Sequence, residues 1–585
     1  MIKTLLSQVK EFKKASFLTP VFMILEVVVE TMIPVAMALM IDNGVEKGNM
    51  SYIYRVGAVM AVLAIAGLIA GFLGGKYGAL ASSGFARNLR KAMYANIQTF
   101  SFSNIDKFST AGLITRLTTD VTNLQNAYQM ILRMCTRAPA SLICAMTMAF
   151  LINARLASVY LIAVIFLGFA LVMILRRATR YFQEVFKKYD DLNASVQENI
   201  SGIRVVKAYV REDYETSKFQ KACNKVYEMF VRAEKLVVMN MPLMQFTVYA
   251  CILCISWLGA KMIVGSSLTT GELMSLLTYC MNILMSLMML SMVFVMVTMS
   301  MASAERVTEV INEKADLSNP AQPVVEVPDG RIDFEHVSFR YKKEGKENVL
   351  KDIDLSIHAG ETIGIIGGTG SAKSSLVNLI SRLYDVSEGS VKVGGIDVRN
   401  YDMEVLRNQV AVVLQKNVLF SGTILENLRW GNKEATEEEC KRACQLACAD
   451  EFIQRMPDGY HTYIEQGGTN VSGGQKQRLC IARALLKKPK ILILDDSTSA
   501  VDTATDAKIR KAFAEEIPDT TKLIIAQRIS SIQSADRIIV MEDGRINGFG
   551  THEELLENNP IYQEVYHSQT KAGGDFDENR GGEQA

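Results

Sequence analysis

The chain contains 585 residues, which is too long for a single hydrophobic core and predicts two or more domains. Its 63 basic and 62 acidic residues leave a formal net charge of +1, so the charge balance gives no support for a nucleic-acid partner. Long uncharged apolar runs fill the sequence up to about residue 302, whereas the remainder has the charge density and turn residues of a soluble α/β protein. The first part is therefore expected to lie in a membrane.

Six apolar segments are long enough to cross a membrane, since a helix needs roughly 20 mostly apolar residues to span the hydrocarbon core. They lie at about 17–41, 54–75, 134–153, 156–175, 241–264 and 273–301. The first segment is too long for a removed signal peptide and lacks a small-residue cleavage site, so it is interpreted as a true span. The sequence predicts a six-helix transmembrane domain over residues 1–311.

The connectors between these spans differ in charge and length. The connector 176–239 carries 13 Lys and Arg residues and the connector 265–272 carries none, so the positive-inside rule places both termini in the cytoplasm. The long connectors are amphipathic, and the helices are expected to continue beyond the membrane and fold back there. The turns of these hairpins, near Asn104–Leu117 and Val210–Tyr214, either contact a nucleotide domain or are solvated helix corners.

Two features inside the spans are candidates for a substrate cavity. Glu26 and Glu30 are four residues apart and share one helix face, and a carboxylate at membrane depth usually faces a cavity or a partner. They either contact a substrate or form a structural hydrogen-bonded pair between helices. The sixth span carries a stripe of methionines, including Met285 and Met292, at helical spacing. Flexible thioether side chains suit apolar ligands of varied shape, although such a stripe also serves helix packing.

The ten cysteines form no C-x-x-C pair. Cys440, Cys444 and Cys448 share one helical face, which is either a metal or redox site or a buried apolar stripe. The stripe is favoured, because no histidine or fourth cysteine stands at ligand spacing.

Residues 312–330 contain three prolines and are interpreted as a linker to a nucleotide-binding domain at 331–568. The domain opens with the alternating strand RIDFEHVSFRY. Tyr341 closes that strand, and its ring either stacks on adenine or is simply exposed at a strand end. The residues 569–585 are rich in glycine and polar side chains and are expected to be disordered.

The segment GGTGSAKSS follows an apolar strand and opens a helix, which is the arrangement of a nucleotide phosphate loop. Backbone N–H groups, the helix dipole and the Lys373 ammonium all favour phosphate there. The strict pattern G-x-x-x-x-G-K-[ST] fails at one position, because Ala372 replaces a glycine. The predicted nucleotide-binding residues of the loop are Gly367, Gly368, Thr369, Gly370, Ser371, Ala372, Lys373, Ser374 and Ser375.

The apolar run ILILDD ends in two aspartates at the carboxyl edge of a predicted parallel strand. Asp495 is placed there to hold Mg²⁺ through its water shell, and Asp496 stands where a general base would polarise an attacking water. Between the loop and this strand, a serine and two glycines precede another helix and form a second phosphate-binding N-terminus. Because one chain would hardly use both sites on one phosphate tail, the second is expected to serve another subunit. Its residues are Val471, Ser472, Gly473, Gly474 and Gln475.

Taken in this order, the motifs resemble those of the ATP-binding cassette family, specifically an exporter-type half-transporter, over about residues 10 to 567. The resemblance implies a six-helix all-α transmembrane domain fused to a P-loop α/β domain that uses ATP and Mg²⁺. It implies that Tyr341 stacks on adenine, that Asp502 forms the D-loop, and that Gln415 joins Ser374 and Asp495 around Mg²⁺, partly through water. It also implies that the cytoplasmic coupling regions are the segments 108–120 and 205–214.

Three positions depart from the family pattern, all on the phosphate-loop side. Asp496 replaces the catalytic glutamate, so its shorter carboxylate is expected to fall short of the water. Gln527 replaces the switch histidine and offers no protonatable imidazole. If the position of Ala372 needs φ > 0, the strain is about 1 kcal/mol. The signature residues, in contrast, keep the Ser-Gly-Gly-Gln core.

This asymmetry resembles the degenerate-site subunit of a heterodimeric exporter, mostly multidrug or lipid-like efflux systems. The resemblance implies a second half-transporter as partner, a small hydrophobic or amphipathic substrate, alternating access, and no nucleic acid. A bacterial plasma membrane is the expected location. Two alternatives remain: a homodimer that hydrolyses slowly through Asp496, and a nucleotide-gated channel or sensor that does not pump.

Overall fold

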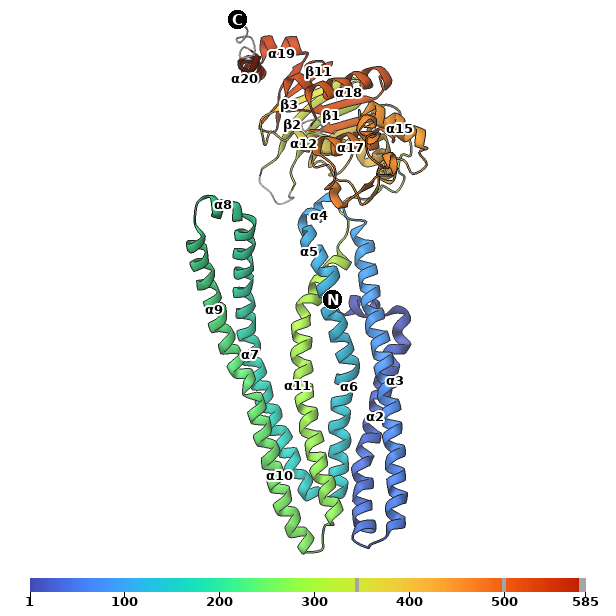
Figure 1. Ribbon diagram of the computed structural model, residues 1–585, viewed down its shortest axis with the longest axis vertical. Helices are drawn as coiled ribbons and strands as arrows, with labels where there is room; N and C mark the ends of the chain where they lie inside the picture. Colours follow the sequence, from blue (N-terminus) through green and yellow to red (C-terminus); the bar gives the residue numbers. More distant parts are fainter. Residues whose placement is uncertain (342–346, 497–500, 578–585) are drawn as a thin grey trace. The chain divides into compact units, whose positions relative to one another are not determined.

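The computed structural model describes residues 1–341, 347–496 and 501–577 (Figure 1). The chain divides into two compact units. The first consists of Met1–Gln98 and Ser109–Glu313, and the second consists of Thr99–Phe108 and Lys314–Ala585. The short segment Thr99–Phe108 therefore belongs to the nucleotide-binding unit, although it lies between two membrane helices in the sequence.

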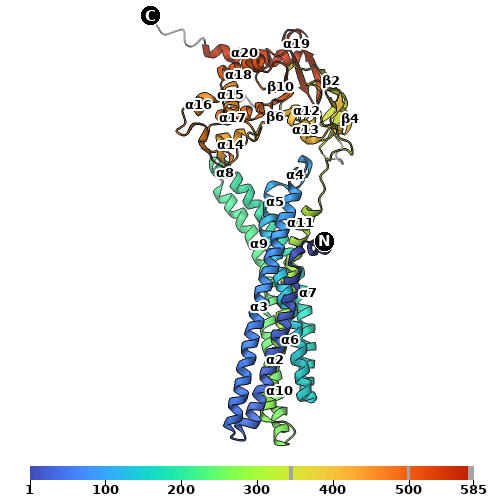
Figure 2. The same ribbon diagram turned by 90° about the vertical axis from the view of Figure 1, so that its right-hand side faces the viewer.

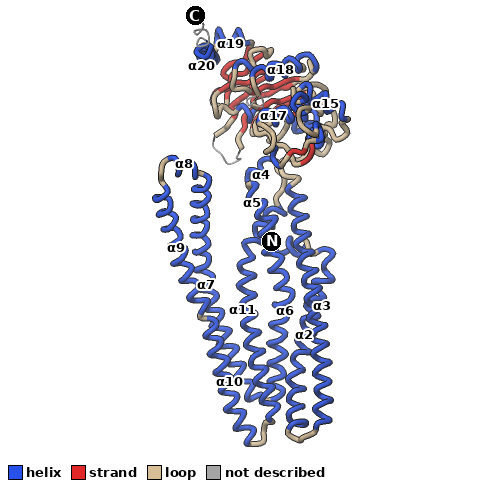
Figure 3. The backbone as a smooth tube through the Cα atoms, in the orientation of Figure 1, coloured by secondary structure: helices blue, strands red, loops and turns tan. Residues whose placement is uncertain are grey.

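The first unit is helical throughout its described secondary structure (Figure 3). In the described part of the chain, six helices are long and apolar enough to cross a membrane, which confirms the six predicted spans. The helices of this unit are α1 (Ile2–Ser7), α2 (Lys13–Met40), α3 (Met50–Ile97), α5 (Thr110–Thr115), α6 (Val121–Ile152), α7 (Ala154–Ser201), α8 (Ile203–Ala208), α9 (Glu212–Val238), α10 (Asn240–Val264) and α11 (Thr270–Asn312).

Several of these helices are longer than a membrane requires. α3 and α7 each contain 48 residues, and at 1.5 Å per residue a helix of that length extends about 70 Å. Both helices are therefore longer than the hydrocarbon core of a bilayer, as expected of spans that continue beyond the membrane. The hairpin of α7, α8 and α9 diverges from the remaining helices of the unit toward α8 (Figure 2).

Buried tyrosines join the helices of the first unit. The hydroxyl of Tyr279 in α11 donates a 2.7 Å hydrogen bond to the carbonyl of Thr31 in α2. The hydroxyl of Tyr160 in α7 donates a bond of the same length to the carbonyl of Leu276 in α11. Each bond satisfies a buried phenol and fixes the register of two neighbouring helices.

The second unit is an α/β fold, as the sequence predicts. Its six-stranded sheet has the order β12-β11-β3-β10-β9-β6, in which β12 alone pairs antiparallel, and a four-stranded antiparallel sheet has the order β2-β1-β4-β5. The strands are β1 (Ile332–Phe339), β2 (Leu350–Ile357), β3 (Thr362–Gly367), β4 (Glu388–Val393), β5 (Ile396–Asp397), β6 (Val410–Val413), β7 (Gly422–Thr423), β8 (Tyr463–Ile464), β9 (Ile491–Asp495), β10 (Thr521–Ile525), β11 (Arg537–Glu542) and β12 (Arg545–Gly550).

The central strands β3, β9 and β10 are nearly continuous apolar runs, because helices cover both faces of a parallel sheet. The helices of this unit are α4 (Phe102–Phe108), α12 (Lys373–Ile380), α13 (Met403–Gln409), α14 (Ile424–Leu428), α15 (Glu437–Leu446), α16 (Asp450–Ile453), α17 (Gly473–Leu485), α18 (Thr503–Glu516), α19 (His552–Asn558) and α20 (Pro560–Asp577). The parallel strands β3 and β9 bring their carboxyl ends to one edge, where the predicted phosphate loop and the aspartates lie.

The C-terminal helix corrects one expectation. α20 continues to Asp577, so the disordered tail predicted from residue 569 is wrong for residues 569–577. Residue 569, the first of the predicted tail, is held by contacts with residues distant in the sequence. Gln569 donates to the carbonyl of Gln527 at 2.8 Å and accepts from the N–H of Ile529 at 2.9 Å. The remaining predicted tail, 578–585, lies outside the described residues.

Candidate nucleotide-binding site

The phosphate loop connects β3 to α12. β3 ends at Gly367, and a Cβ at that position would lie 2.2 Å from the carbonyl oxygen of Met541 in the neighbouring strand. The close approach therefore requires glycine. The loop then turns through Gly368, Thr369, Gly370 and Ser371 into the helix, which begins at Lys373. This is the predicted strand, loop and helix of a phosphate-binding site.

Lys373 lies over the loop that precedes it. Its ammonium donates to the carbonyls of Gly367 and Gly368, both at 2.8 Å, and to Oγ of Ser371 at 3.3 Å. Burial lowers the pKa of Lys373, and the nearby Asp495 and Asp496 partly offset this effect. The cation therefore lies at the loop backbone, where a phosphate tail would be held.

Ala372 precedes α12 in the left-handed conformation, with φ of 72° and ψ of 23°. The conditional prediction that this position needs φ > 0 is thus confirmed. An L-residue in this region costs about 1 kcal/mol more than glycine. Ala372 therefore has the backbone conformation expected of the glycine that it replaces, and the alanine is strained in that conformation.

The residues at the end of β9 fit a magnesium ion. Oγ of Ser374 donates a 3.0 Å hydrogen bond to Oδ1 of Asp495, so an alcohol and a carboxylate oxygen already lie together. Oxygen ligands of these two kinds are those that Mg²⁺ takes beside phosphates. Burial raises the pKa of Asp495, and the hydrogen bond from Ser374 opposes the rise.

Asp496 is brought together with the two predicted glutamines. Its Oδ2 accepts a 2.8 Å hydrogen bond from Nε2 of Gln527 and a longer contact of 3.4 Å from Nε2 of Gln415. The residue is buried and has φ of 47°. Its carboxylate is therefore held by amide groups at the edge of the sheet.

Tyr341 lies just beyond β1, half exposed, with its hydroxyl 2.8 Å from Oγ of Ser375. The contact joins the predicted base-stacking ring to the helix of the phosphate loop. Exposure of the ring leaves area on which a base can stack.

The signature segment forms the beginning of α17. Ser472 caps this helix, its Oγ accepting from the N–H of Gln475 at 3.3 Å while the Gln475 side chain accepts from the N–H of Ser472 at 2.9 Å. Ser472 and Gly473 are exposed, whereas Val471, Gly474 and Gln475 are half-buried. Asp502 caps α18 in a similar way, and its bond from the N–H of Thr505 lowers its pKa. The predicted helix N-terminus is confirmed.

Comparison with known proteins decides the family. The model of the ABC transporter transmembrane region matches residues 16–307, and the model of the ABC transporter ATP-binding region, described as "ABC transporter", matches residues 350–499. An uncharacterized ABC transporter ATP-binding protein, YfiB of Bacillus subtilis (strain 168), is 37% identical over 96% of this chain and 98% of its own length. The chain belongs to the ABC transporter family.

Two further relatives also match this chain over most of its length, and the name of one of them states a function. An uncharacterized ABC transporter ATP-binding protein of Mycobacterium tuberculosis (strain ATCC 25618 / H37Rv) is 36% identical over 97% of this chain and 98% of its own length. An ATP-dependent lipid A-core flippase of Desulfotalea psychrophila (strain LSv54 / DSM 12343) is 34% identical over 83% of this chain and 84% of its own length. The chain is an ABC exporter half-transporter, with transmembrane and ATP-binding domains in one polypeptide.

In the transmembrane domain of this ABC exporter, Arg137 of α6 binds both predicted carboxylates of α2. One guanidinium nitrogen lies 2.8 Å from Oε1 of Glu26, and another lies 2.9 Å from Oε2 of Glu30. The contacts of Glu26 and Glu30 thus agree with the interpretation of a structural hydrogen-bonded link between two helices, here α2 and α6. Arg137 is not among the predicted site residues, although a cation inside the span 134–153 is itself a signal of a functional or structural partner.

The methionine stripe of α11 is largely uncovered in the single chain. Met285 is 50% exposed and Met292 is 65% exposed, so neither side chain is packed away by the helices of its own chain. The two side chains are therefore not packed against other helices of the same chain, and both the substrate and the helix-packing interpretations of the stripe stay predictions. Their surface is free for lipid, a substrate or another subunit.

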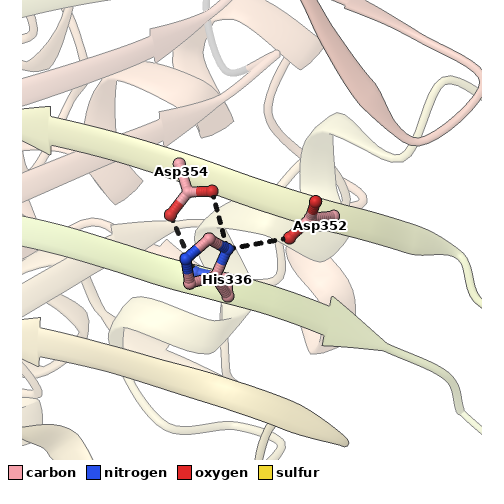
Figure 4. A group of neighbouring side chains, drawn as sticks. All are labelled: His336, Asp352 and Asp354. Atoms are coloured by element: carbon pink, nitrogen blue, oxygen red, sulfur yellow. Dashed lines mark hydrogen bonds and ion pairs between the residues drawn. The ribbon is translucent and has the colours of Figure 1, made fainter.

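Two other groups of side chains lie outside the nucleotide site. Figure 4 shows His336 of β1 beside Asp352 and Asp354 of β2; its Nδ1 is 3.1 Å from an oxygen of each carboxylate. Their hydrogen bond and charge, led by Asp352, raise the pKa of His336. All three are exposed, and such surface groups are common without an ion. Cys440 and Cys444 are buried in the core, and the half-buried Cys448 packs against it, which supports the apolar interpretation of that face.

Proposed function

We propose that this chain is one subunit of a heterodimeric ABC exporter, whose own phosphate-loop site binds ATP but hydrolyses it poorly. The observation that supports this most strongly is the position of Asp496. It replaces the glutamate expected as general base, it is buried, and Gln527 and Gln415 both donate to it. A general base must come within hydrogen-bond reach of the proton that it removes. A short carboxylate held by amides is poorly placed to do so.

The signature segment supports the second half of the proposal. Ser472 and Gln475 cap α17 and leave the helix N-terminus accessible, with the Ser-Gly-Gly-Gln core complete. This end would hold the phosphates of an ATP bound to the partner's loop. In this chain's own site, Ser374, Asp495 and Gln415 would hold Mg²⁺, which neutralises phosphate charge.

The ATPase activity of the assembled pair tests the asymmetry. Replacing the partner's catalytic glutamate with glutamine should lower turnover about 100-fold or more, because general base catalysis is lost. Asp496→Asn should leave turnover within about twofold, since that site contributes little hydrolysis. The opposite pattern would overturn the degenerate-site assignment.

Two alternatives are separated by simple measurements. Because aspartate is still a base, a homodimer could hydrolyse ATP slowly through Asp496; robust ATPase activity of this chain purified alone would favour it. A nucleotide-gated channel or sensor would bind ATP without pumping, and accumulation of a substrate against its gradient in vesicles would exclude that class.

For the substrate we propose a hydrophobic or amphipathic molecule, drug-like or lipid-like. The lipid A-core flippase among the relatives and the exposed thioethers of Met285 and Met292 both favour this class. Glu26 and Glu30 are already paired with Arg137, so we assign them first to the helix interface and not to a cationic substrate. We propose the bacterial plasma membrane as the location, with both termini in the cytoplasm.

A further inference from the structure

Tyr384 lies in the segment after α12 and packs against the ring of Tyr341. The two ring centroids are 5.1 Å apart and the ring planes are nearly perpendicular, at 89°. Phe339, at the end of β1, contacts both rings, with centroid distances of 4.8 Å to Tyr341 and 5.6 Å to Tyr384. Since the Tyr341 hydroxyl also contacts Ser375, the ring of Tyr341 is oriented from two sides.

The hydroxyl of Tyr384 contacts α4, in the same compact unit. It donates a 2.9 Å hydrogen bond to Oδ2 of Asp106, and the ring centroid of Phe102 lies 6.0 Å from that of Tyr384. Burial, together with the bond to Asp106, raises the pKa of Tyr384. The hydroxyl therefore keeps its proton and remains a donor at neutral pH.

α4 is also tied to the chain that follows α11. Nδ2 of Asn104 donates to the carbonyl of Lys314 at 3.0 Å, and Oγ of Ser103 donates to Oδ2 of Asp316 at 3.0 Å. In the sequence, α4 itself lies between α3 and α5. A displacement of α4 would therefore act on its own connections to α3 and α5 and on the segment that follows α11.

This inference rests on the proposed ATP-binding function, with Tyr341 as the ring on which adenine is expected to stack. We propose that Tyr384 is a positioning residue that makes adenine binding and the position of α4 depend on each other. Its ring supports the ring on which the base stacks, and its hydroxyl holds α4 through Asp106. A base on Tyr341 restricts both rings, and movement of α4 withdraws the bond that orients Tyr384. Such coupling is reciprocal: α4 must change the affinity for adenine by the factor with which adenine changes α4.

The ring of Tyr384 is tested by labelling this chain in the assembled transporter with 8-azido-ATP, in competition with ATP or tripolyphosphate. Tripolyphosphate has the phosphate tail and lacks the base. Tyr384→Leu removes the support of Tyr341, so the ATP concentration that halves labelling should rise about threefold or more. The tripolyphosphate concentration that halves labelling should change less than about twofold. Equal changes for both competitors would overturn the role of the ring.

Tyr341→Ala separates this inference from the proposed function. If Tyr341→Ala leaves competition by ATP unchanged, the ATP-binding role of Tyr341 is itself wrong. If Tyr341→Ala weakens ATP but Tyr384→Leu does not, the ATP-binding role stands and the positioning role of Tyr384 is wrong.

The hydroxyl is tested by hydrogen–deuterium exchange of residues 102–108 with ATP or tripolyphosphate bound. ATP should slow exchange there more than tripolyphosphate does, and Tyr384→Phe should reduce this difference about threefold. Asp106→Ala should do the same, and the double variant should be no worse than either single one, because both remove one bond.

Tyr401→Phe is the matched control, since its hydroxyl donates a 2.8 Å hydrogen bond to the carbonyl of Val393 and is fully buried in the same domain. It should leave the exchange of residues 102–108 unchanged. If Tyr384→Phe keeps the full difference between ATP and tripolyphosphate, or if Tyr401→Phe loses it equally, the proposed coupling is wrong.

Discussion

The backbone conformation of Ala372 affects the stability of the nucleotide-binding domain. The residue keeps φ at 72°, a conformation that glycine adopts freely and alanine does not. Relief of the strain by Ala372→Gly is partly offset by the larger entropy of glycine in the unfolded chain. We expect a net stabilisation of about 0.5 kcal/mol, seen as a rise of about 2 °C in the unfolding temperature of the nucleotide-binding domain.

Ala507→Gly is the control for Ala372→Gly. Ala507 is exposed within α18, where glycine costs about 0.5–1 kcal/mol, so the same substitution should lower the unfolding temperature. If both variants shift the unfolding temperature in the same direction, strain at Ala372 is not what the substitution relieves.

At the scale of helices, the contact between α2 and α6 depends on Arg137. Arg137→Met would leave Glu26 and Glu30 without their cation. The side chain of Glu26 is only 14% exposed, so its loss of a partner is costly, whereas that of Glu30 is 52% exposed and contributes less. We expect a destabilisation of about 2 kcal/mol, measured as the unfolding temperature of the purified transporter in lipid nanodiscs.

Neutral replacements provide the decisive comparison for Arg137. Adding Glu26→Gln and Glu30→Gln to Arg137→Met removes the unpaired charges and should recover most of the lost stability. Arg155→Met is the control, because Arg155 is exposed at the start of α7 and should change stability by less than about 0.5 kcal/mol. If the triple variant is less stable than Arg137→Met, the ion pair is not the cause.

The elements differ in how far the sequence predicts them. The phosphate loop was predictable because β3, the glycines and α12 are consecutive, and the chemistry depends on a local pattern. The contacts of Tyr384 with Asp106, and of Gln569 with Gln527, join residues far apart in the chain. No periodicity or motif encodes such a pair, since only the folded chain brings its members together.

At the scale of the whole molecule, the orientation in the membrane is the remaining prediction. The connector between α10 and α11 carries no Lys or Arg between residues 265 and 272, whereas 176–239 carries 13. By the positive-inside rule, this asymmetry predicts that Ser267 lies outside the cell and Tyr209 inside. Both residues are exposed, so each can report its side as an introduced cysteine.

A membrane-impermeant maleimide should therefore label Ser267→Cys in intact cells, and Tyr209→Cys only after the cells are permeabilised. The unsubstituted chain, which has ten cysteines of its own, shows how much labelling occurs without the introduced cysteine. The same orientation places the long α7–α9 hairpin, the signature helix and both termini on the side where ATP is available. Labelling of Tyr209→Cys in intact cells would put the hairpin outside and would contradict its expected role as a cytoplasmic coupling region.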